Sequence, residues 1–230
     1  MARIILPHSQ AWPLCYIRGV QNVIQPLLAA LTFLAVSVSA QVAPSATKSN
    51  APNSAPRMDE KTAAPKSAAS TETALLAGGC FWGMEEILRK IPGVLDTKVG
   101  YIGGTVPNPT YKLVCTGITG HAEAVKIIFD PTKITYEAML GYFFRMHDST
   151  TLNRQHNDVG TQYRSAIFYT TDAQKQTAER VKDRVNKSGK FKKPVVTEIT
   201  QAGEFWPGED YHQKYLIKNP NGYNCHILQD

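Results

Sequence analysis

Residues 74–88 read ALLAGGCFWGMEEIL and hold the pattern that decides the fold. The apolar run 74–77 predicts a short buried strand, and the two glycines after it allow the backbone to turn sharply. From Cys80 onward, apolar side chains recur near helical spacing until the Pro-Gly pair at 92–93, which predicts the end of a helix. The sequence therefore places Cys80 at a strand-to-helix turn.

The chain continues to alternate short strands with helices after this turn. Strands are predicted over 94–101, 123–129, 163–169 and 195–199, and helices over 135–147, 171–189 and 211–218. The repeated strand–helix–strand order predicts an α+β domain, a two-layer sandwich with a ferredoxin-like mixed sheet and helices packed on it.

The composition is that of a globular domain rather than of a disordered chain. The 230 residues are 43% hydrophobic and 19% charged, close to the average for soluble domains. The net charge of +6 comes without a dense basic run, so nucleic acid is not an expected partner. Four cysteines without a C-x-x-C pair argue against a disulfide scaffold and against a structural zinc site. No metal site is expected.

The first forty residues have the features of a signal peptide. The largely apolar run 27–38 (LLAALTFLAVSV) would rise about 18 Å as a helix, too short for the ~30 Å hydrocarbon core of a membrane. Small residues at Val38 and Ala40 fit a signal-peptidase site. We therefore predict a signal peptide over 1–40, export to the periplasm or out of the cell, and no stable membrane insertion.

Three alternatives to export stay open at this point. The apolar run can also form a buried core helix, and the absence of acidic residues before Asp59 is compatible with an organelle transit peptide. An internal start at Met58 would give a cytosolic product. Residues 41–73 then contain 21 Ala, Pro, Ser and Thr among 33 residues and no aromatic residue, which predicts a flexible linker. The catalytic domain is expected over 74–230.

The position of Cys80 predicts a reactive thiol. The first turn of a helix carries unpaired N–H groups and the positive end of the helix dipole, which stabilise a thiolate. Such a position lowers a thiol pKa from about 8.5 to roughly 3.5–7.5. The alternative is an inert cysteine buried in an apolar strand.

Three classes of function compete for such a cysteine. A papain-like cysteine hydrolase needs a histidine base. The candidate bases are His121, His147, His156 and His212. A thiol redox enzyme needs a second cysteine instead, and Cys225 in the C-terminal segment suits that role. A binding module without catalysis would use the aromatic residues beside Cys80 as a contact patch.

Six segments together point to a known family. They are GCFWG at 79–83, GYIGG at 100–104, NPTY at 108–111, TGHAEAV at 119–125, GTQYRS at 160–165 and KNPNGY at 218–223. In this order and spacing the chain resembles the peptide methionine-S-sulfoxide reductases, the A-type enzymes, over residues 74–226. The resemblance implies an oxidoreductase that reduces the S epimer of methionine sulfoxide, in proteins and free, and so repairs oxidative damage.

The resemblance also implies the roles of the catalytic residues. The Cys80 thiolate attacks the sulfoxide sulfur and becomes a sulfenic acid, while Glu123 acts as an acid on the sulfoxide oxygen. Glu123 begins a strand of apolar residues, where burial raises a carboxyl pKa and keeps the group protonated. Tyr111 and Tyr163 supply hydroxyl donors to the same oxygen, in the manner of an oxyanion hole. Asp158 matches the family's supporting acid, with an indirect role in ordering the site.

Substrate binding and recycling are assigned in the same way. Phe81 and Trp82 are expected to form the pocket for the methyl group of the substrate. Cys225 matches the family's recycling cysteine, which forms a disulfide with Cys80, although the usual tail runs further and often holds two such cysteines. Only five residues follow Cys225, so we expect little to hold this thiol in place. Cys115 matches a common family cysteine without an essential role.

The partners follow from the resemblance as well. The external reductant is expected to be thioredoxin or, after export, a thioredoxin-like protein of the envelope. No metal or organic cofactor is implied. The enzyme is expected to act as a monomer on oxidised proteins and on free methionine sulfoxide.

Overall fold

A computed structural model of the protein describes residues 70–229. The predicted signal peptide (1–40) and the predicted linker (41–73), apart from its last four residues, lie outside this part of the chain. The first strand, β1 (Glu72–Gly78), begins two residues earlier than the sequence predicts. The end of the predicted linker therefore belongs to the folded domain, because Glu72 and Thr73 pair with the neighbouring strand.

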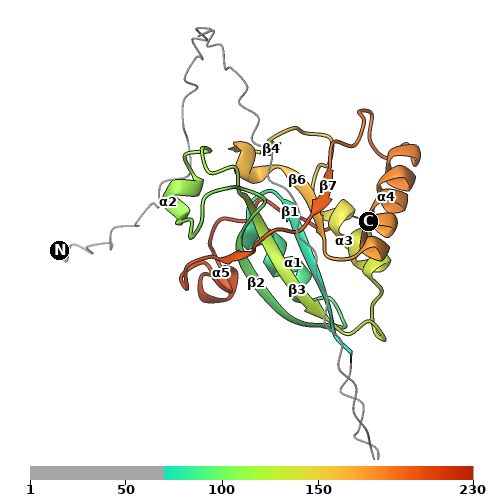
Figure 1. The fold of residues 1–230 in the computed structure, drawn as a ribbon, viewed down its shortest axis with the longest axis horizontal. Helices are drawn as coiled ribbons and strands as arrows, with labels where there is room; N and C mark the ends of the chain where they lie inside the picture. The colour runs from blue at the N-terminus through green and yellow to red at the C-terminus, as the bar shows by residue number, and fades with distance from the viewer. Residues whose placement is uncertain (1–69, 230) are drawn as a thin grey trace, which may run out of the picture. The chain divides into compact units, whose positions relative to one another are not determined.

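A six-stranded mixed sheet forms the centre of the domain (Figure 1). Its other strands are β2 (Val94–Ile102), β3 (Ala122–Phe129), β6 (Ser165–Tyr169), β7 (Glu198–Gln201) and β8 (Trp206–Pro207). The strand order is β7-β6-β1-β3-β2-β8, with β6 and β7 parallel and the other neighbours antiparallel. The central order β6-β1-β3-β2 confirms the predicted ferredoxin-like mixed sheet.

Three helices pack on one face of this sheet, as expected for an α+β sandwich. They are α1 (Phe81–Leu88), α3 (Tyr136–Met146) and α4 (Asp172–Lys187). Short elements complete the domain: α2 (Tyr111–Val114), α5 (Tyr215–Lys218), the 3₁₀ helix η1 (Thr161–Tyr163), and a small hairpin of β4 (Arg154–Gln155) and β5 (Asp158–Val159). Among the described residues, none of the helices has the length and apolar character needed to cross a membrane.

Alternation along β1 assigns its side chains to two cores. Ala74 and Leu76 belong to the larger core, which contains the buried side chains of all three long helices. Leu75 and Ala77 point to the opposite face and pack in a smaller cluster. The strand before the turn is thus buried on both faces. This packing fixes the position of the turn that follows β1.

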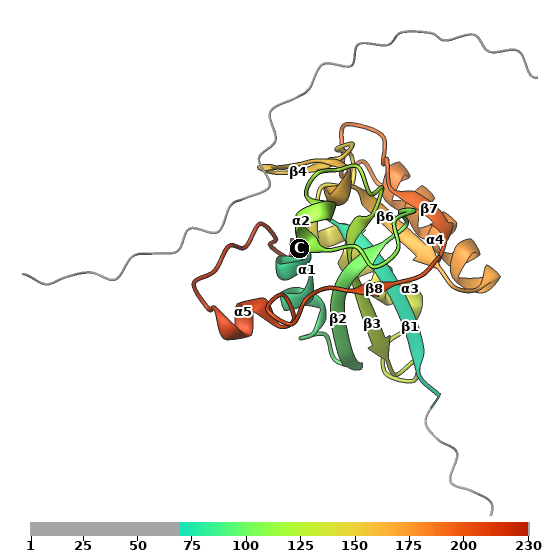
Figure 2. The same cartoon turned by 60° about the vertical axis from the view of Figure 1, so that its left-hand side comes forward.

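The C-terminal segment crosses the domain and returns to α1. In Figure 2 it runs in red from β8 to α5 and back toward the start of α1. The sequence predicts a helix over 211–218, but the observed helix begins only at Tyr215. Lys214 has a φ of +53°, a left-handed conformation that interrupts a right-handed helix.

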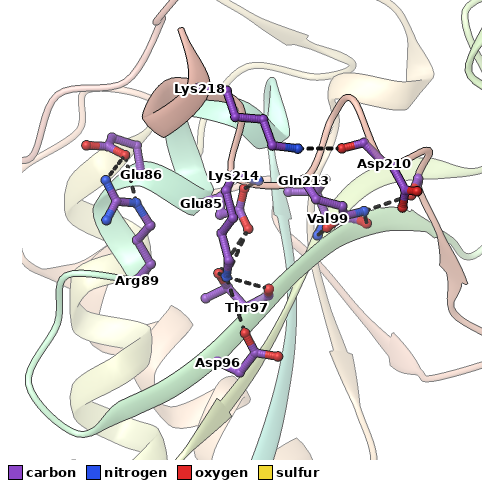
Figure 3. Close-up of polar contacts among 11 residues, drawn as sticks. Glu85, Glu86, Arg89, Asp96, Thr97, Val99, Asp210, Gln213, Lys214 and Lys218 are labelled. Carbon is purple, nitrogen blue, oxygen red and sulfur yellow. Dashed lines mark hydrogen bonds and ion pairs between the residues drawn. The ribbon is translucent and has the colours of Figure 1, made fainter. Parts of the chain in front are cut away.

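A polar cluster around Glu85 attaches this segment to α1 and β2 (Figure 3). Glu85 is 1% exposed and accepts hydrogen bonds from the Lys214 N–H (2.8 Å) and the Thr97 hydroxyl (2.9 Å). The Lys214 ammonium donates to the Thr97 carbonyl at 2.8 Å. These bonds hold the left-handed residue and with it the chain that leads to the C-terminus.

Replacing Glu85 by alanine should destabilise the domain because two buried donors lose their acceptor. We expect the free energy of unfolding to fall by about 2–4 kcal/mol. Glu86→Ala is the matched control, since Glu86 pairs with Arg89 on the partly exposed side of the same helix, and its loss should cost less than about 1 kcal/mol. Urea unfolding curves measure both changes, and equal losses would contradict the anchoring role of Glu85.

Candidate active site

Cys80 lies at the strand-to-helix turn. Gly79 has a φ of +107°, a conformation that glycine adopts at little cost, and Cys80 is the extended N-cap residue of α1. The Cys80 side chain is 6% exposed. The turn therefore places this sulfur just below the surface, beside the first amides of the helix.

Glu123, in β3, faces this turn from the neighbouring strand. Its side chain is 1% exposed, and its Oε2 accepts a hydrogen bond from the Phe81 N–H at 3.1 Å. Burial raises the pKa of Glu123 well above its ordinary value, and the charges of Asp158 and Cys225 raise it further. The pKa of Glu123 thus shifts in the direction expected for a carboxyl group buried in an apolar strand.

Tyr111 and Tyr163 bring two phenol groups to the same region from α2 and η1. Burial raises the pKa of both hydroxyls, and in each case negative charge on Glu123 and on Cys80 raises it further. Both phenols therefore keep their protons at neutral pH and can donate hydrogen bonds.

Phe81 and Trp82 form one aromatic cluster with residues of the C-terminal segment. Phe81 is buried in the main core, whereas Trp82 is half-buried and stacks on Tyr215 with ring centroids 3.8 Å apart. The Trp82 indole N–H donates to Nδ1 of His212 at 3.0 Å. The cluster gives the first turn of α1 an apolar flank.

The segment around Cys225 is held in place, contrary to the expectation of a loosely held thiol. The Tyr223 hydroxyl donates a hydrogen bond to Oδ2 of Asp158 at 3.1 Å. His226 is buried and its Nε2 bonds the carbonyl oxygen of Gly78 at 2.8 Å. Beyond it, the N–H of Gln229 donates to the carbonyl of Arg145 at 3.0 Å. The few residues after Cys225 are enough to fix it because their backbone and side-chain groups bond to the domain.

Cys80 and Cys225 lie close enough for each to shift the pKa of the other. Cys225 Sγ lies 3.1 Å from Nδ1 of His226, and the same ring lies against Gly79 and Gly83 at the turn that holds Cys80. The C-terminal segment thus brings the second cysteine to the start of α1.

The structure corrects the predicted low pKa of Cys80. Burial raises the pKa of Cys80 well above the ordinary thiol value, and the hydrogen bond with Cys225 and the charge of Glu123 raise it further. Interactions with Cys80 and His226 lower the pKa of Cys225 to about 4. The pKa values of the two cysteines are thus shifted in opposite directions.

Asp158 interacts with Cys225 as well as with Glu123. It is buried in β5, and burial, together with the neighbouring Cys225, raises its pKa to about 7. Its hydrogen bond from the Tyr223 hydroxyl links β5 to the segment that carries Cys225. The indirect role of Asp158 stays a prediction.

The four histidines considered as bases for a hydrolase do not bond the Cys80 sulfur. His121 bonds the Gly104 N–H and the Val106 carbonyl, and His156 is exposed. His147 bonds the Phe143 carbonyl and the Ser165 hydroxyl. Burial lowers the pKa of both His147 and His212 to about 4. These histidines are parts of structural networks.

Sequence reasoning missed His226. It follows the recycling cysteine directly, as Asn224-Cys225-His226, and that adjacency is the only local signal for it. Gly79 and Gly83 leave room for its ring: a Cβ at Gly83 would lie 2.7 Å from Nδ1 of His226, and one at Gly79 would lie 3.0 Å from its Cε1. The glycines of the motif thus serve the C-terminal segment as well as the turn.

A family model described as peptide methionine sulfoxide reductase matches residues 72–230. The chain belongs to this family. It is 54% identical over 162 residues to peptide methionine sulfoxide reductase MsrA 1 of Mesorhizobium japonicum, covering 70% of this chain and 92% of that protein. It is 53% identical to MsrA of Nocardia farcinica, covering 68% and 89%. The protein is thus a thiol-dependent oxidoreductase that reduces methionine sulfoxide.

Solved structures of other family members share the fold. Mxr1 from Saccharomyces cerevisiae in reduced form has a TM-score of 0.67 and 39% identity, covering 70% of this chain and 94% of that one. Methionine sulfoxide reductase A of Corynebacterium diphtheriae has a TM-score of 0.61 and 40% identity, covering 68% and 79%. Both likenesses confirm the predicted fold class.

Cys225 is partly exposed at the surface of the reductase, whereas Cys80 is buried. A groove of about 540 Å³ borders the partly exposed Cys225. Its lining includes Met146, Arg154, His156, Asn157, Tyr223, Asn224, Ile227 and Gln229. Ile227 is 78% exposed at its edge. A second protein can approach the Cys225 sulfur from this side.

Among the described residues, no group of three or more His, Cys, Asp and Glu side chains is arranged to hold a metal ion. The acidic and thiol groups of the reductase are close to one another, but they are bonded to amides, phenols and the His226 ring instead.

The distribution of charge predicts which thiol an alkylating reagent modifies first. Cys225, partly exposed and with a pKa of about 4, should react with iodoacetamide at a nearly constant rate from about pH 5.5 to 8, because the thiolate is the reactive form. The buried Cys80 should react at least about tenfold more slowly, and faster as the pH rises. Peptide mapping by mass spectrometry measures both rates, and faster labelling of Cys80 would place the thiolate there instead.

Proposed function

We propose that this reductase acts on the S epimer of methionine sulfoxide, in proteins and free, through a Cys80 sulfenic acid and a Cys80–Cys225 disulfide. The observation that carries the proposal is the pair of neighbouring cysteines beside the buried Glu123, whose pKa is raised. A sulfoxide needs a proton on its oxygen to make that oxygen a leaving group, and a thiol to attack its sulfur.

The first step transfers the sulfoxide oxygen to the enzyme. Cys80 Sγ attacks the sulfoxide sulfur while Glu123 protonates the oxygen, with Tyr111 and Tyr163 donating hydrogen bonds to it. The thiol proton of Cys80 passes to the Glu123 carboxylate that this protonation leaves. The sulfur–oxygen bond of the substrate breaks as the oxygen moves to the Cys80 sulfur, and the bond between the two sulfurs breaks with it. Methionine then leaves, and Cys80 carries the oxygen as sulfenic acid. Cys80 is oxidised by two electrons and the substrate sulfur is reduced by two.

The second step forms the disulfide and releases water. Cys225 Sγ attacks the Cys80 sulfur, the sulfur–oxygen bond breaks, and the departing hydroxide takes up a proton. The proximity of the two cysteines, each of which shifts the pKa of the other, supports this step. A dithiol reductant then attacks the disulfide and returns both cysteines to thiols while it becomes a disulfide itself.

We propose thioredoxin or a thioredoxin-like protein as that reductant. Disulfide exchange needs a protein thiolate to reach one sulfur from outside. The groove beside the partly exposed Cys225 offers such access, whereas Cys80 is 6% exposed. The attack is therefore assigned to Cys225, which leaves Cys80 as the first thiol released.

The location and assembly of the enzyme are proposals from the sequence. The features of residues 27–41 favour export, which makes a thioredoxin-like protein of the envelope the reductant. N-terminal sequencing of the mature protein at or near Gln41 would support this proposal, and a start at Met58 in a cytosolic fraction would contradict it. We also propose a monomer, which sedimentation would test.

The two cysteine positions separate the steps of the proposed reaction. With racemic methionine sulfoxide and dithiothreitol, the wild-type enzyme should consume only the S epimer. Cys80→Ser should lose activity by more than about a thousandfold, because a hydroxyl is far less nucleophilic than a thiolate. Cys225→Ser is the matched control: it should still form one equivalent of methionine but should not turn over with thioredoxin. Chiral chromatography of the remaining sulfoxide measures which epimer is consumed. Consumption of both epimers, or an active Cys80→Ser variant, would refute the proposal.

Glu123→Gln should slow the reduction without preventing binding. Glutamine keeps an acceptor for the Phe81 N–H but cannot deliver a proton, so kcat should fall by about 10²–10⁴. In the wild type the pKa of Glu123 is raised. The reduction rate should therefore be high below this pKa and should fall as the pH rises through it. The variant should not show this fall in rate at high pH. A rate and pH profile equal to the wild type would show that Glu123 only maintains the structure.

A further inference from the structure

His226 is the side chain at the cysteine pair that the reaction described above does not use. It is 2% exposed, and its ring lies between two fixed partners, the carbonyl oxygen of Gly78 at 2.8 Å from Nε2 and Cys225 Sγ at 3.1 Å from Nδ1. Its backbone N–H donates to Oδ1 of Asn224 at 3.0 Å. The ring is thus oriented by bonds on opposite sides.

These partners determine the tautomer of the ring. A backbone carbonyl can only accept a hydrogen bond, so Nε2 must carry the proton. In the neutral ring the proton is then absent from Nδ1, which is left as an acceptor facing the Cys225 sulfur. The geometry is that of a thiol and an imidazole base, with the far side of the ring held by a third group.

We propose that His226 is the general base for the recycling cysteine, taking the thiol proton of Cys225 so that its thiolate can attack the sulfenic acid on Cys80. This inference rests on the proposed function and assigns a residue to its second step. The proton moves from Sγ to Nδ1, the bond between the two sulfurs forms, and the sulfur–oxygen bond on Cys80 breaks. The departing hydroxide takes up one proton, so the imidazolium returns to the neutral ring and one water is released.

The titratable groups that interact with His226 come from three parts of the domain. They are Cys225 beside it, Asp158 from β5 and His147 from the end of α3. Burial lowers the pKa of His147 to about 4, so this neighbour is neutral at pH 7. Cys225 is the group that the Nδ1 atom of His226 faces, at 3.1 Å.

The Gln variant at this position separates chemistry from structure. His226→Gln keeps an N–H donor for the Gly78 carbonyl but has no group that can accept the thiol proton. After one equivalent of methionine sulfoxide, methionine formation reports the first step and the loss of two thiols reports the second. We expect the first rate within about threefold of wild type and the second at least about 100-fold slower at pH 7.

The pH profile distinguishes a base from a merely positioning side chain. In the variant, disulfide formation should recover about tenfold per pH unit up to the ordinary thiol pKa of about 8.5, because hydroxide replaces the missing base. In the wild type it should be nearly constant over this range. His121→Gln is the matched control, a buried histidine with two hydrogen bonds far from the thiols, and it should leave both rates unchanged.

Each outcome decides the inference separately from the proposed function. An unchanged second step, or a slow second step without recovery at high pH, would overturn the role of His226 while the first step still supports the reductase reaction. Failure of the wild type to form methionine would overturn the proposed function itself. If His226→Gln does not fold, nitrogen NMR of the wild type decides. An imidazolium or an Nε2–H tautomer supports the base, and a neutral Nδ1–H tautomer refutes it.

Discussion

The hydrogen bond between His226 and the Gly78 carbonyl joins two positions 148 residues apart and sets the arrangement of both sulfurs. Gly78 ends the first strand, so the bond attaches the C-terminal segment to the turn itself rather than to a distant surface. With the ring fixed there, the preceding residue, Cys225, can only lie at the start of α1. Because Gly79 and Gly83 have no side chains, the segment can approach this closely. The glycine motif and the last residues of the chain are therefore one structural unit.

Four acidic groups share the small volume that this unit encloses, namely Cys80, Glu123, Asp158 and Cys225. Ionisation of one raises the pKa of the others, and burial penalises every charge. The pKa of Cys225 is lowered, whereas burial raises the pKa of Glu123 and of Asp158. The attachment of the C-terminal segment to the turn therefore influences the ionisation of both cysteines and both carboxyl groups.

The order of strands and helices could be predicted from the sequence because its signals are local and periodic. The stretch 74–88 contains a complete strand, turn and helix start, and the observed β1 and α1 lie where it predicts them. The burial of Glu123 could also be predicted, because the residue begins a strand of apolar residues. The helix expected from 211 was wrong in its start because the left-handed Lys214 depends on Glu85, which is 129 residues away.

The ordering of the C-terminal segment could not be predicted, because bonds from side chains to distant backbone leave no periodic trace. The low pKa expected for Cys80 was wrong for a related reason. Local reasoning gave the amides at the start of α1 to Cys80, but the Phe81 N–H donates to Glu123 from β3. Burial, which depends on tertiary packing, raises the pKa of Cys80. The helix start stabilises charge, as elementary electrostatics requires, but tertiary contacts decide which residue carries it.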